Sequence, residues 1–141
     1  MNPSIEFTNT ISIQDYINLR RSVDFAITTE KRVSIALSNS LYILVATIDG
    51  KPVGMARVVG DGGYVYFICD VIVHPDYQSN GIGRELITQV LSWIESQVEE
   101  GETVMVNLMS AYEKEPFYEK LGFSRRPFGN HGCGMSKWIH R

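Results

Sequence analysis

Residues 69–87 read CDVIVHPDYQSNGIGRELI, and this stretch decides the fold. A β-branched run is followed by Gly81-Ile82-Gly83 and then by a helical pattern of apolar residues. The first N–H groups of a helix have no partner within it, and glycine lets a ligand approach the backbone closely. This corner between a strand and a helix therefore suits an anion such as a phosphate, which Arg84 would also attract. A glycine-rich turn without a ligand is the alternative interpretation.

Two well-known nucleotide loops do not fit these residues. A Walker loop needs a Lys-Ser/Thr pair after its second glycine, whereas Arg84-Glu85 follows Gly83 here. A dinucleotide-binding turn needs a third glycine, and Leu86 occupies that position. If the corner binds a phosphate, the ligand belongs to another class.

Length and composition set broad limits on the fold and the function. The 141 residues are expected to form one domain, residues 1–141, of ordinary globular composition with 44% apolar residues. A net charge of −3 argues against a general nucleic-acid binder. The chain shows no secretory leader and no apolar window long enough to span a bilayer. We therefore expect a cytoplasmic protein with reduced cysteines and without nucleic-acid or membrane partners.

The apolar periodicity predicts one mixed α/β domain. Asp49-Gly50 is a strong signal for a hairpin turn between two strands. Ser12 is placed to cap one helix near the start of the chain, and Thr29 or Thr28 is placed to cap the next. Helices are expected at residues 13–23, 29–37, 81–100 and 112–123, and strands at residues 5–7, 41–48, 53–59, 64–73, 103–109 and 134–139.

Two motifs in this order resemble those of the GNAT superfamily of acetyl-CoA-dependent N-acetyltransferases. The segment from Gln78 to Gly83 matches the family signature Gln/Arg-x-x-Gly-x-Gly/Ala between a long strand and a helix. Residues 111–123, AYEKEPFYEKLGF, resemble the closing helix of the family. The resemblance covers residues 41–139 and implies a mixed, mostly antiparallel central sheet with a splayed long strand and flanking helices.

The same resemblance implies an acetyl-CoA site. In the family, the pantetheine arm pairs with the end of the long strand, which corresponds here to the backbone of Val71, Ile72 and Val73. One N–H group of that strand would polarise the thioester carbonyl. The residues expected to bind the rest of the cofactor around its pyrophosphate are Gln78, Ser79, Asn80, Gly81, Ile82, Gly83 and Arg84.

Two side chains are candidates for proton transfer. Tyr118 matches the tyrosine that family members place near the cofactor sulfur, where a phenol can protonate the departing thiolate; the alternative is a tyrosine that only packs in the core. Asp70 is the acidic residue within the long strand, and it would serve as the base for the amine. It could instead satisfy neighbouring backbone or bind an ammonium group of the substrate. Glucosamine-phosphate acetyltransferases carry a glutamate before this aspartate, and Cys69 replaces it here.

Other polar residues suggest weaker interpretations. Cys69 is interpreted as a small apolar filler rather than a nucleophile. The cysteines and histidines lack the spacing of a metal site. The acceptor pocket is expected between the two N-terminal helices and residues 125–134. The acceptor would be the primary amine of a small molecule, an amino acid or a peptide end. A protein N-terminal or lysine acetyltransferase and a non-catalytic acyl-CoA sensor are the alternatives, and a homodimer is one expectation from the family.

Overall fold

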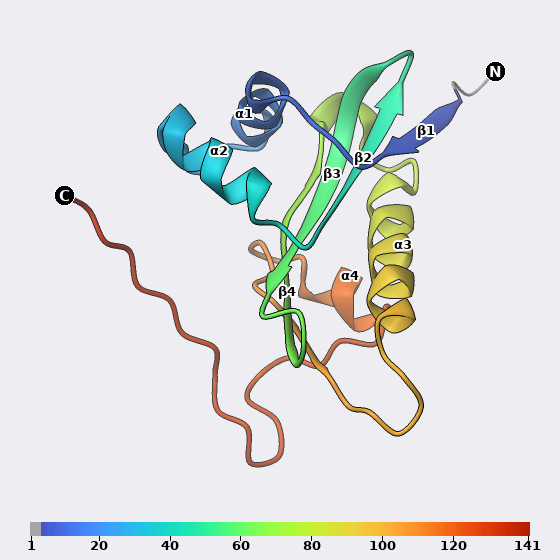
Figure 1. Cartoon of the computed structure of the whole chain (residues 1–141), viewed down its shortest axis with the longest axis vertical. Coiled ribbons are helices and arrows are strands. Elements are labelled where there is room, and N and C mark those ends of the chain that lie inside the picture. Colours follow the sequence, from blue (N-terminus) through green and yellow to red (C-terminus); the bar gives the residue numbers. More distant parts are fainter. Residues whose placement is uncertain (1–3) are drawn as a thin grey trace. The chain divides into compact units, whose positions relative to one another are not determined.

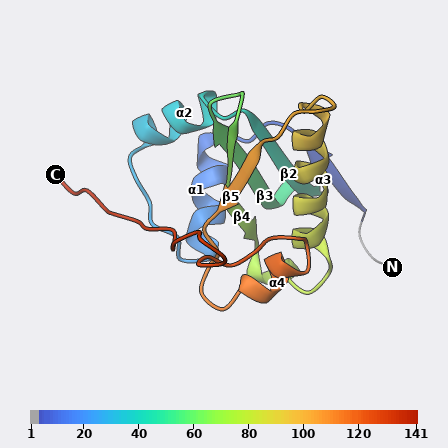
Figure 2. The same ribbon diagram turned by 90° about the horizontal axis from the view of Figure 1, so that it is seen from below.

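The computed structural model describes residues 4–141. Along the chain it divides into two compact units, with the boundary between Leu108 and Met109. The first unit contains a five-stranded sheet in the order β1-β2-β3-β4-β5 (Figures 1 and 2). Neighbouring strands are antiparallel except β4 and β5, which are parallel. The predicted mixed, mostly antiparallel sheet is confirmed. The strands are β1 (Ile5–Thr8), β2 (Tyr42–Ile48), β3 (Lys51–Gly60), β4 (Val65–Val73) and β5 (Met105–Leu108).

Helices cover both faces of this sheet. On one face lie α1 (Ile13–Ser22) and α2 (Glu30–Ser38), and on the other lies α3 (Ile82–Ser96), as Figure 2 shows. The predicted cap of α1 is confirmed, because the Ser12 hydroxyl accepts from the Asp15 N–H at 3.0 Å. Of the two candidates for α2, Thr29 is the cap, and its hydroxyl accepts from the Arg32 N–H at 3.2 Å. Each cap satisfies a donor that the helix itself cannot pair.

Strands β2 and β3 are joined by the predicted hairpin turn. Asp49 and Gly50 both have positive φ, 50° and 75°, as a two-residue type I′ turn requires. The turn sets the register, in which Ile48 pairs with Lys51. The central part of β2 and β3 is buried on both faces, which explains the nearly continuous apolar runs in their sequences.

Strand β4 contains a β-bulge at Asp70, whose φ is 53°. Arg57 pairs with Cys69 and Met55 pairs with Ile72, so three steps along β4 oppose two steps along β3. One extra residue reverses the alternation of side chains between the two faces. Tyr66 accordingly lies against Trp93 of α3, whereas Ile72 packs with the apolar residues of α1 and α2.

Helix α3 packs closely on the sheet through one apolar stripe. A Cβ built on Gly54 of β3 would lie 3.3 Å from Ile82 and from Leu86, so glycine permits this approach. The helix ends at Ser96, earlier than predicted. The Ser96 hydroxyl donates to the Trp93 carbonyl, and the Gln97 N–H donates to carbonyls of the last turn, which closes the helix. Gly101 instead lies in a following turn with a φ of 88°. The buried residues of the stripe are Ile82, Leu86, Ile87, Val90 and Ile94.

The second unit, Met109–Arg141, contains the short helix α4 (Glu115–Glu119). Pro116 lies in its first turn, as predicted, where a missing N–H has no cost. The rings of Phe117 and Phe123 each meet Tyr118 edge to face, with centroids 5.0 and 6.0 Å from it. The predicted strand at residues 134–139 is wrong: these residues form no strand and are exposed, because no neighbouring strand pairs with them.

Two further predictions concern the chain as a whole. The expectation of a single domain stays a prediction, because the described residues divide into two compact units. Among the helices within residues 4–141, none combines the length and the apolar character that crossing a membrane requires.

Candidate active site

The predicted phosphate corner has the backbone of an anion site. Gly81 has a φ of 78° and precedes α3 without any side-chain cap. The first N–H that bonds back toward this turn is that of Glu85, to the Gly81 carbonyl at 3.1 Å. In the described part of the chain, the N–H groups of residues 82–84 therefore have no hydrogen-bond partner. No atom lies within 4 Å of a Cβ built on Gly81, so the backbone faces open space.

The loop before Gly81 is fastened by its own side chains. The Gln78 amide donates to the Val73 carbonyl at 2.9 Å, and the Asn80 amide donates to the Tyr77 carbonyl at 3.0 Å. A one-turn helix, η1 (Pro75–Tyr77), links this loop to β4. Gln78 and Asn80 thus hold the shape of the corner, while the N–H groups that follow remain available to a ligand.

Strand β4 has a free edge next to this corner. Strand β5 pairs with it only from Val65 to Ile68, but β4 continues to Val73. On its other side the same end is paired with β3, where Val73 lies opposite Gly54. Within residues 4–141, no strand pairs with the β5 side of Val71, Ile72 or Val73. Apart from the Val73 carbonyl, which accepts from Gln78, their backbone groups on that side can pair with an extended ligand, as in β-strand addition.

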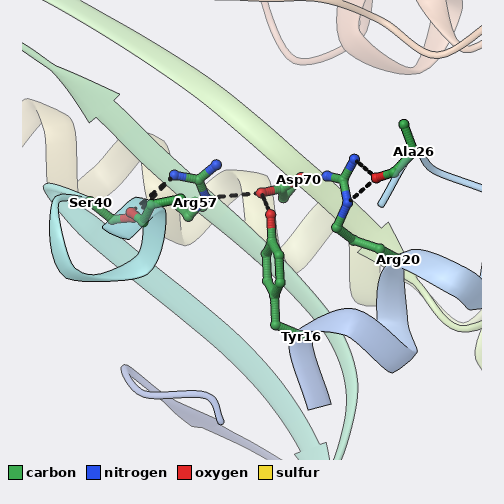
Figure 3. Close-up of polar contacts among 7 residues, drawn as sticks. Tyr16, Arg20, Ala26, Ser40, Arg57 and Asp70 are labelled. Atoms are coloured by element: carbon green, nitrogen blue, oxygen red, sulfur yellow. Dashed lines mark hydrogen bonds and ion pairs between the residues drawn. The ribbon is translucent and has the colours of Figure 1, made fainter. Parts of the chain in front are cut away.

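Asp70 lies at the centre of a polar network on the α1 and α2 face (Figure 3). One carboxylate oxygen accepts from the Tyr16 hydroxyl at 2.7 Å and from Arg57 Nε at 2.9 Å. The other oxygen pairs with Arg20. Asp70 is buried, and the β-bulge turns it toward these donors. The carboxylate is therefore compensated by two guanidinium groups and one hydroxyl.

Both arginines are tied to the backbone as well. Arg20 Nε donates to the Ala26 carbonyl at 2.8 Å, and its guanidinium lies 5.4 Å from the centre of the Phe25 ring. Arg57 Nη1 lies 3.2 Å from the Ser40 hydroxyl and 3.4 Å from the Ala36 carbonyl, at the end of α2. The network thus connects both helices to the two strands beneath them.

The ionisation of the neighbouring groups follows from this environment. Burial, and then the Asp70 charge and hydrogen bond, raise the pKa of Tyr16 to about 12. Burial raises the pKa of the Cys69 thiol to about 11, although Arg57 and Arg20 act in the opposite direction. For Arg57, burial works to lower the pKa, but nearby Cys69 and Asp70 outweigh it and the pKa is raised. At neutral pH, Tyr16 and Cys69 are uncharged, whereas Arg57 is a cation.

Tyr118 lies in the second unit, where it is buried. Burial raises the pKa of its phenol, so the hydroxyl keeps its proton at neutral pH. It makes no hydrogen bond to any residue of the described chain, and no buried side-chain oxygen or nitrogen there lacks a partner. The hydroxyl of Tyr118 is therefore in contact with solvent and can donate to a ligand.

Comparison with known proteins identifies this arrangement. The family model described as the acetyltransferase (GNAT) domain matches residues 39–125, which include the free strand edge and the glycine corner. The chain belongs to the GNAT acetyltransferase family. It is 34% identical over 127 residues to the uncharacterized N-acetyltransferase ycf52 of Pyropia yezoensis, covering 86% of this chain and 70% of that protein.

Two solved structures place the GNAT fold on nearly the whole chain. A GNAT-family acetyltransferase from Streptococcus pneumoniae is 32% identical, with a TM-score of 0.77 over 98% of each chain. A probable acetyltransferase from meticillin-resistant Staphylococcus aureus is 27% identical, with a TM-score of 0.84 over 96% of this chain and all of that one. The predicted family and fold class are thus confirmed.

The structure brings together some of the predicted residues and adds others. The free strand edge and the glycine corner lie in one unit, joined by residues 74–77. Tyr118 belongs to the other unit. Sequence reasoning missed Arg57 and Tyr16 as partners of Asp70. The available signal was a single arginine inside the otherwise apolar strand of residues 53–59.

Proposed function

We propose that this GNAT protein transfers the acetyl group of acetyl-CoA directly to a primary amine of a small molecule, an amino acid or a peptide end. One observation carries the proposal: the end of β4 has a free edge, and the helix that follows has an uncapped N-terminus. The first feature suits an extended arm that carries amides, and the second suits a pyrophosphate. Both lie within residues 69–87.

The residues present fit acetyl-CoA, which would supply the thioester whose acyl group the amine accepts. The unpaired N–H groups of residues 82–84 would hold the pyrophosphate, and Arg84 would add a positive charge. The backbone groups of residues 71–73 on the free edge, apart from the Val73 carbonyl that accepts from Gln78, would pair with the pantetheine arm. One N–H of that strand would donate to the thioester oxygen and stabilise the negative charge that develops there.

Tyr118 is the proposed acid. Its hydroxyl stays protonated at neutral pH and has no partner among the described residues, so it can give a proton to the departing thiolate. We expect Tyr118→Phe to lower kcat at least about 100-fold, as for loss of a general acid, with little change in the Kd of CoA. Stopped-flow measurement of thiol release and calorimetry with CoA separate the two quantities. Equal turnover would remove this assignment.

The contacts of Asp70 bear on its proposed role as base. Both of its oxygens already accept hydrogen bonds or ion pairs, which favours a positioning role over removal of the amine proton. The pH profile of kcat/KM distinguishes the two roles in Asp70→Asn. Loss of the acidic limb of the profile would support the base; a uniformly lowered profile of unchanged shape would support positioning.

Binding of CoA is the experiment that tests the proposed function. Gly81→Asp should abolish the thermal shift that CoA produces in the wild type, because the new carboxylate adds bulk and repels the pyrophosphate. The matched control is Gly62→Asp, since Gly62 also has a positive φ and open space around it. This control carries the same charge and a similar backbone strain at a different turn.

The outcomes separate the competing functions. Normal CoA binding by Gly81→Asp would contradict the phosphate site. CoA binding without thiol release across a broad amine panel would indicate an acyl-CoA sensor. Thiol release only with protein or peptide acceptors would indicate a protein N-terminal or lysine acetyltransferase.

A further inference from the structure

The network around Asp70 contains more positive than negative charge. Arg20 and Arg57 both pair with the single carboxylate of Asp70. Tyr16 and Cys69 also belong to this network, and both are neutral at pH 7. Two guanidinium groups and one carboxylate leave a net charge of about +1. An excess charge in a partly buried site is costly unless an anion compensates it.

One nitrogen of Arg57 is available to such an anion. Nε donates to Asp70, and Nη1 is directed to Ser40 and the Ala36 carbonyl. Nη2 makes no hydrogen bond with any described residue, and Figure 3 shows it without a partner. Since no buried side-chain nitrogen in residues 4–141 is left without a partner, Nη2 must contact solvent. The Arg57 side chain as a whole is only 12% exposed.

Arg57 lies on the strand that pairs with this part of β4. Arg57 pairs directly with Cys69, two residues before Val71, where the proposed thioester arm would begin to pair with the free edge of β4. Asp70 holds Arg57 by its Nε and leaves the outer nitrogen free. An acceptor bound here would have its amine near the strand edge and a second group within reach of Arg57.

We propose that Arg57, held by Asp70 and supported by the charge of Arg20, binds the carboxylate of the acceptor, so that the substrate is a small amino acid. The inference rests on the proposed function, whose direct-attack chemistry places the acceptor at this strand. A carboxylate fits better than a phosphate, because its single negative charge matches the net charge of the network. Guanidinium groups bind carboxylates in a planar, directional arrangement.

Pairs of acceptors that differ only in this charge test the proposal. We expect the full chain with acetyl-CoA to prefer glycine over glycinamide, or β-alanine over β-alaninamide, by about 10- to 100-fold in kcat/KM, the value of one charge-assisted hydrogen bond. Amide formation lowers the pKa of the neighbouring amine, so chemistry alone favours the amide. Aminomethylphosphonate serves as the dianionic probe.

Variants assign the effect to Arg57. Arg57→Gln should reduce the carboxylate-to-amide ratio of kcat/KM to 1 or below, whereas Arg57→Lys should keep part of the preference for the carboxylate. The control Lys51→Gln removes one positive charge from an exposed position of the same strand and should leave the ratio unchanged. Thermal unfolding of each variant confirms that the fold persists. A ratio that is unchanged in Arg57→Gln, or wild-type preference for the amide or the phosphonate, overturns the proposal.

Calorimetry provides a readout that does not need turnover. The CoA-loaded chain should bind β-alanine, and Arg57→Gln should weaken that binding about 10-fold or more. Binding of CoA with no difference between β-alanine and β-alaninamide overturns this inference and leaves the proposed function intact. Absence of CoA binding overturns the proposed function itself.

Discussion

The two faces of the central sheet bury different kinds of side chain. Under α3 the interface is apolar, and Trp93 stacks on Tyr42 with ring centroids 4.6 Å apart. Under α1 and α2 an apolar cluster surrounds a buried carboxylate and its three donors. Removing an apolar side chain leaves a cavity, whereas removing one member of the network leaves uncompensated charge. The face under α3 therefore stabilises the sheet by apolar packing, and the opposite face holds the charged groups around Asp70.

The largest loss of stability is expected when the two arginines lose the carboxylate that compensates their charge. Asp70→Ala should lower the free energy of unfolding by about 4 kcal/mol, because Arg20 and Arg57 then lie partly buried without an anion. Urea denaturation at pH 7 measures the change. Asp76→Ala is the control, since that carboxylate is 82% exposed and should contribute no more than about 0.5 kcal/mol. A loss at Asp70 as small as at Asp76 would remove the distinction between the two faces.

A cavity under α3 should cost somewhat less. Leu86 is fully buried, and Leu86→Ala should lower the free energy of unfolding by about 3 kcal/mol through lost burial and an unfilled space. Denaturant unfolding gives this value, and the acceptor preference of the folded variant should stay that of the wild type. A changed acceptor preference would show that the apolar face also controls specificity.

The hydroxyl of Tyr16 isolates one hydrogen bond of the network. Tyr16→Phe keeps the ring but removes the donor to Asp70, and we expect a loss of about 2 kcal/mol, as for a hydrogen bond to a charged group. Tyr66→Phe is the comparison on the α3 face, where no hydrogen bond joins the hydroxyl to a described residue. Equal losses in the two variants would contradict the importance of the Asp70 contact.

The smallest predicted effect is a dependence on alkaline pH. The pKa of Tyr16 is raised from 10 in the unfolded chain to about 12 in the fold. The stabilisation is complete below pH 10 and is lost as the pH rises from 10 through 12, because the unfolded chain releases this proton first. By pH 11 the loss amounts to about 1.4 kcal/mol. The fall in stability between pH 8 and 11 should be smaller by this amount in Tyr16→Phe.

Much of the local structure could be predicted from short patterns in the sequence. The caps at Ser12 and Thr29, the turn at Asp49-Gly50 and the corner at Gly81 each depend on residues a few positions apart, and each could be predicted. The strand predicted at residues 134–139 failed because a strand needs a partner, and pairing is not a local property.

The contacts of Asp70 could not be predicted for a related reason. Regular alternation along residues 64–73 would direct Asp70 and Tyr66 to the same face of the sheet. The bulge reverses that alternation, and it is defined by the register with β3 rather than by the residues of β4 alone. Arg57 was visible as a charge inside an apolar strand, but its partner depended on this register.

The bulge at Asp70 also restricts how this family member can tolerate insertions and deletions. Removing one residue between Cys69 and Ile72 would restore regular alternation and turn Ile72 from one face of the sheet to the other. Asp70 would lose both arginines in the same event, and the strand edge that precedes the glycine corner would shift by one residue. Loops such as residues 61–64 can change length between relatives, but the number of residues from Arg57 to Gly81 is expected to vary only outside β4.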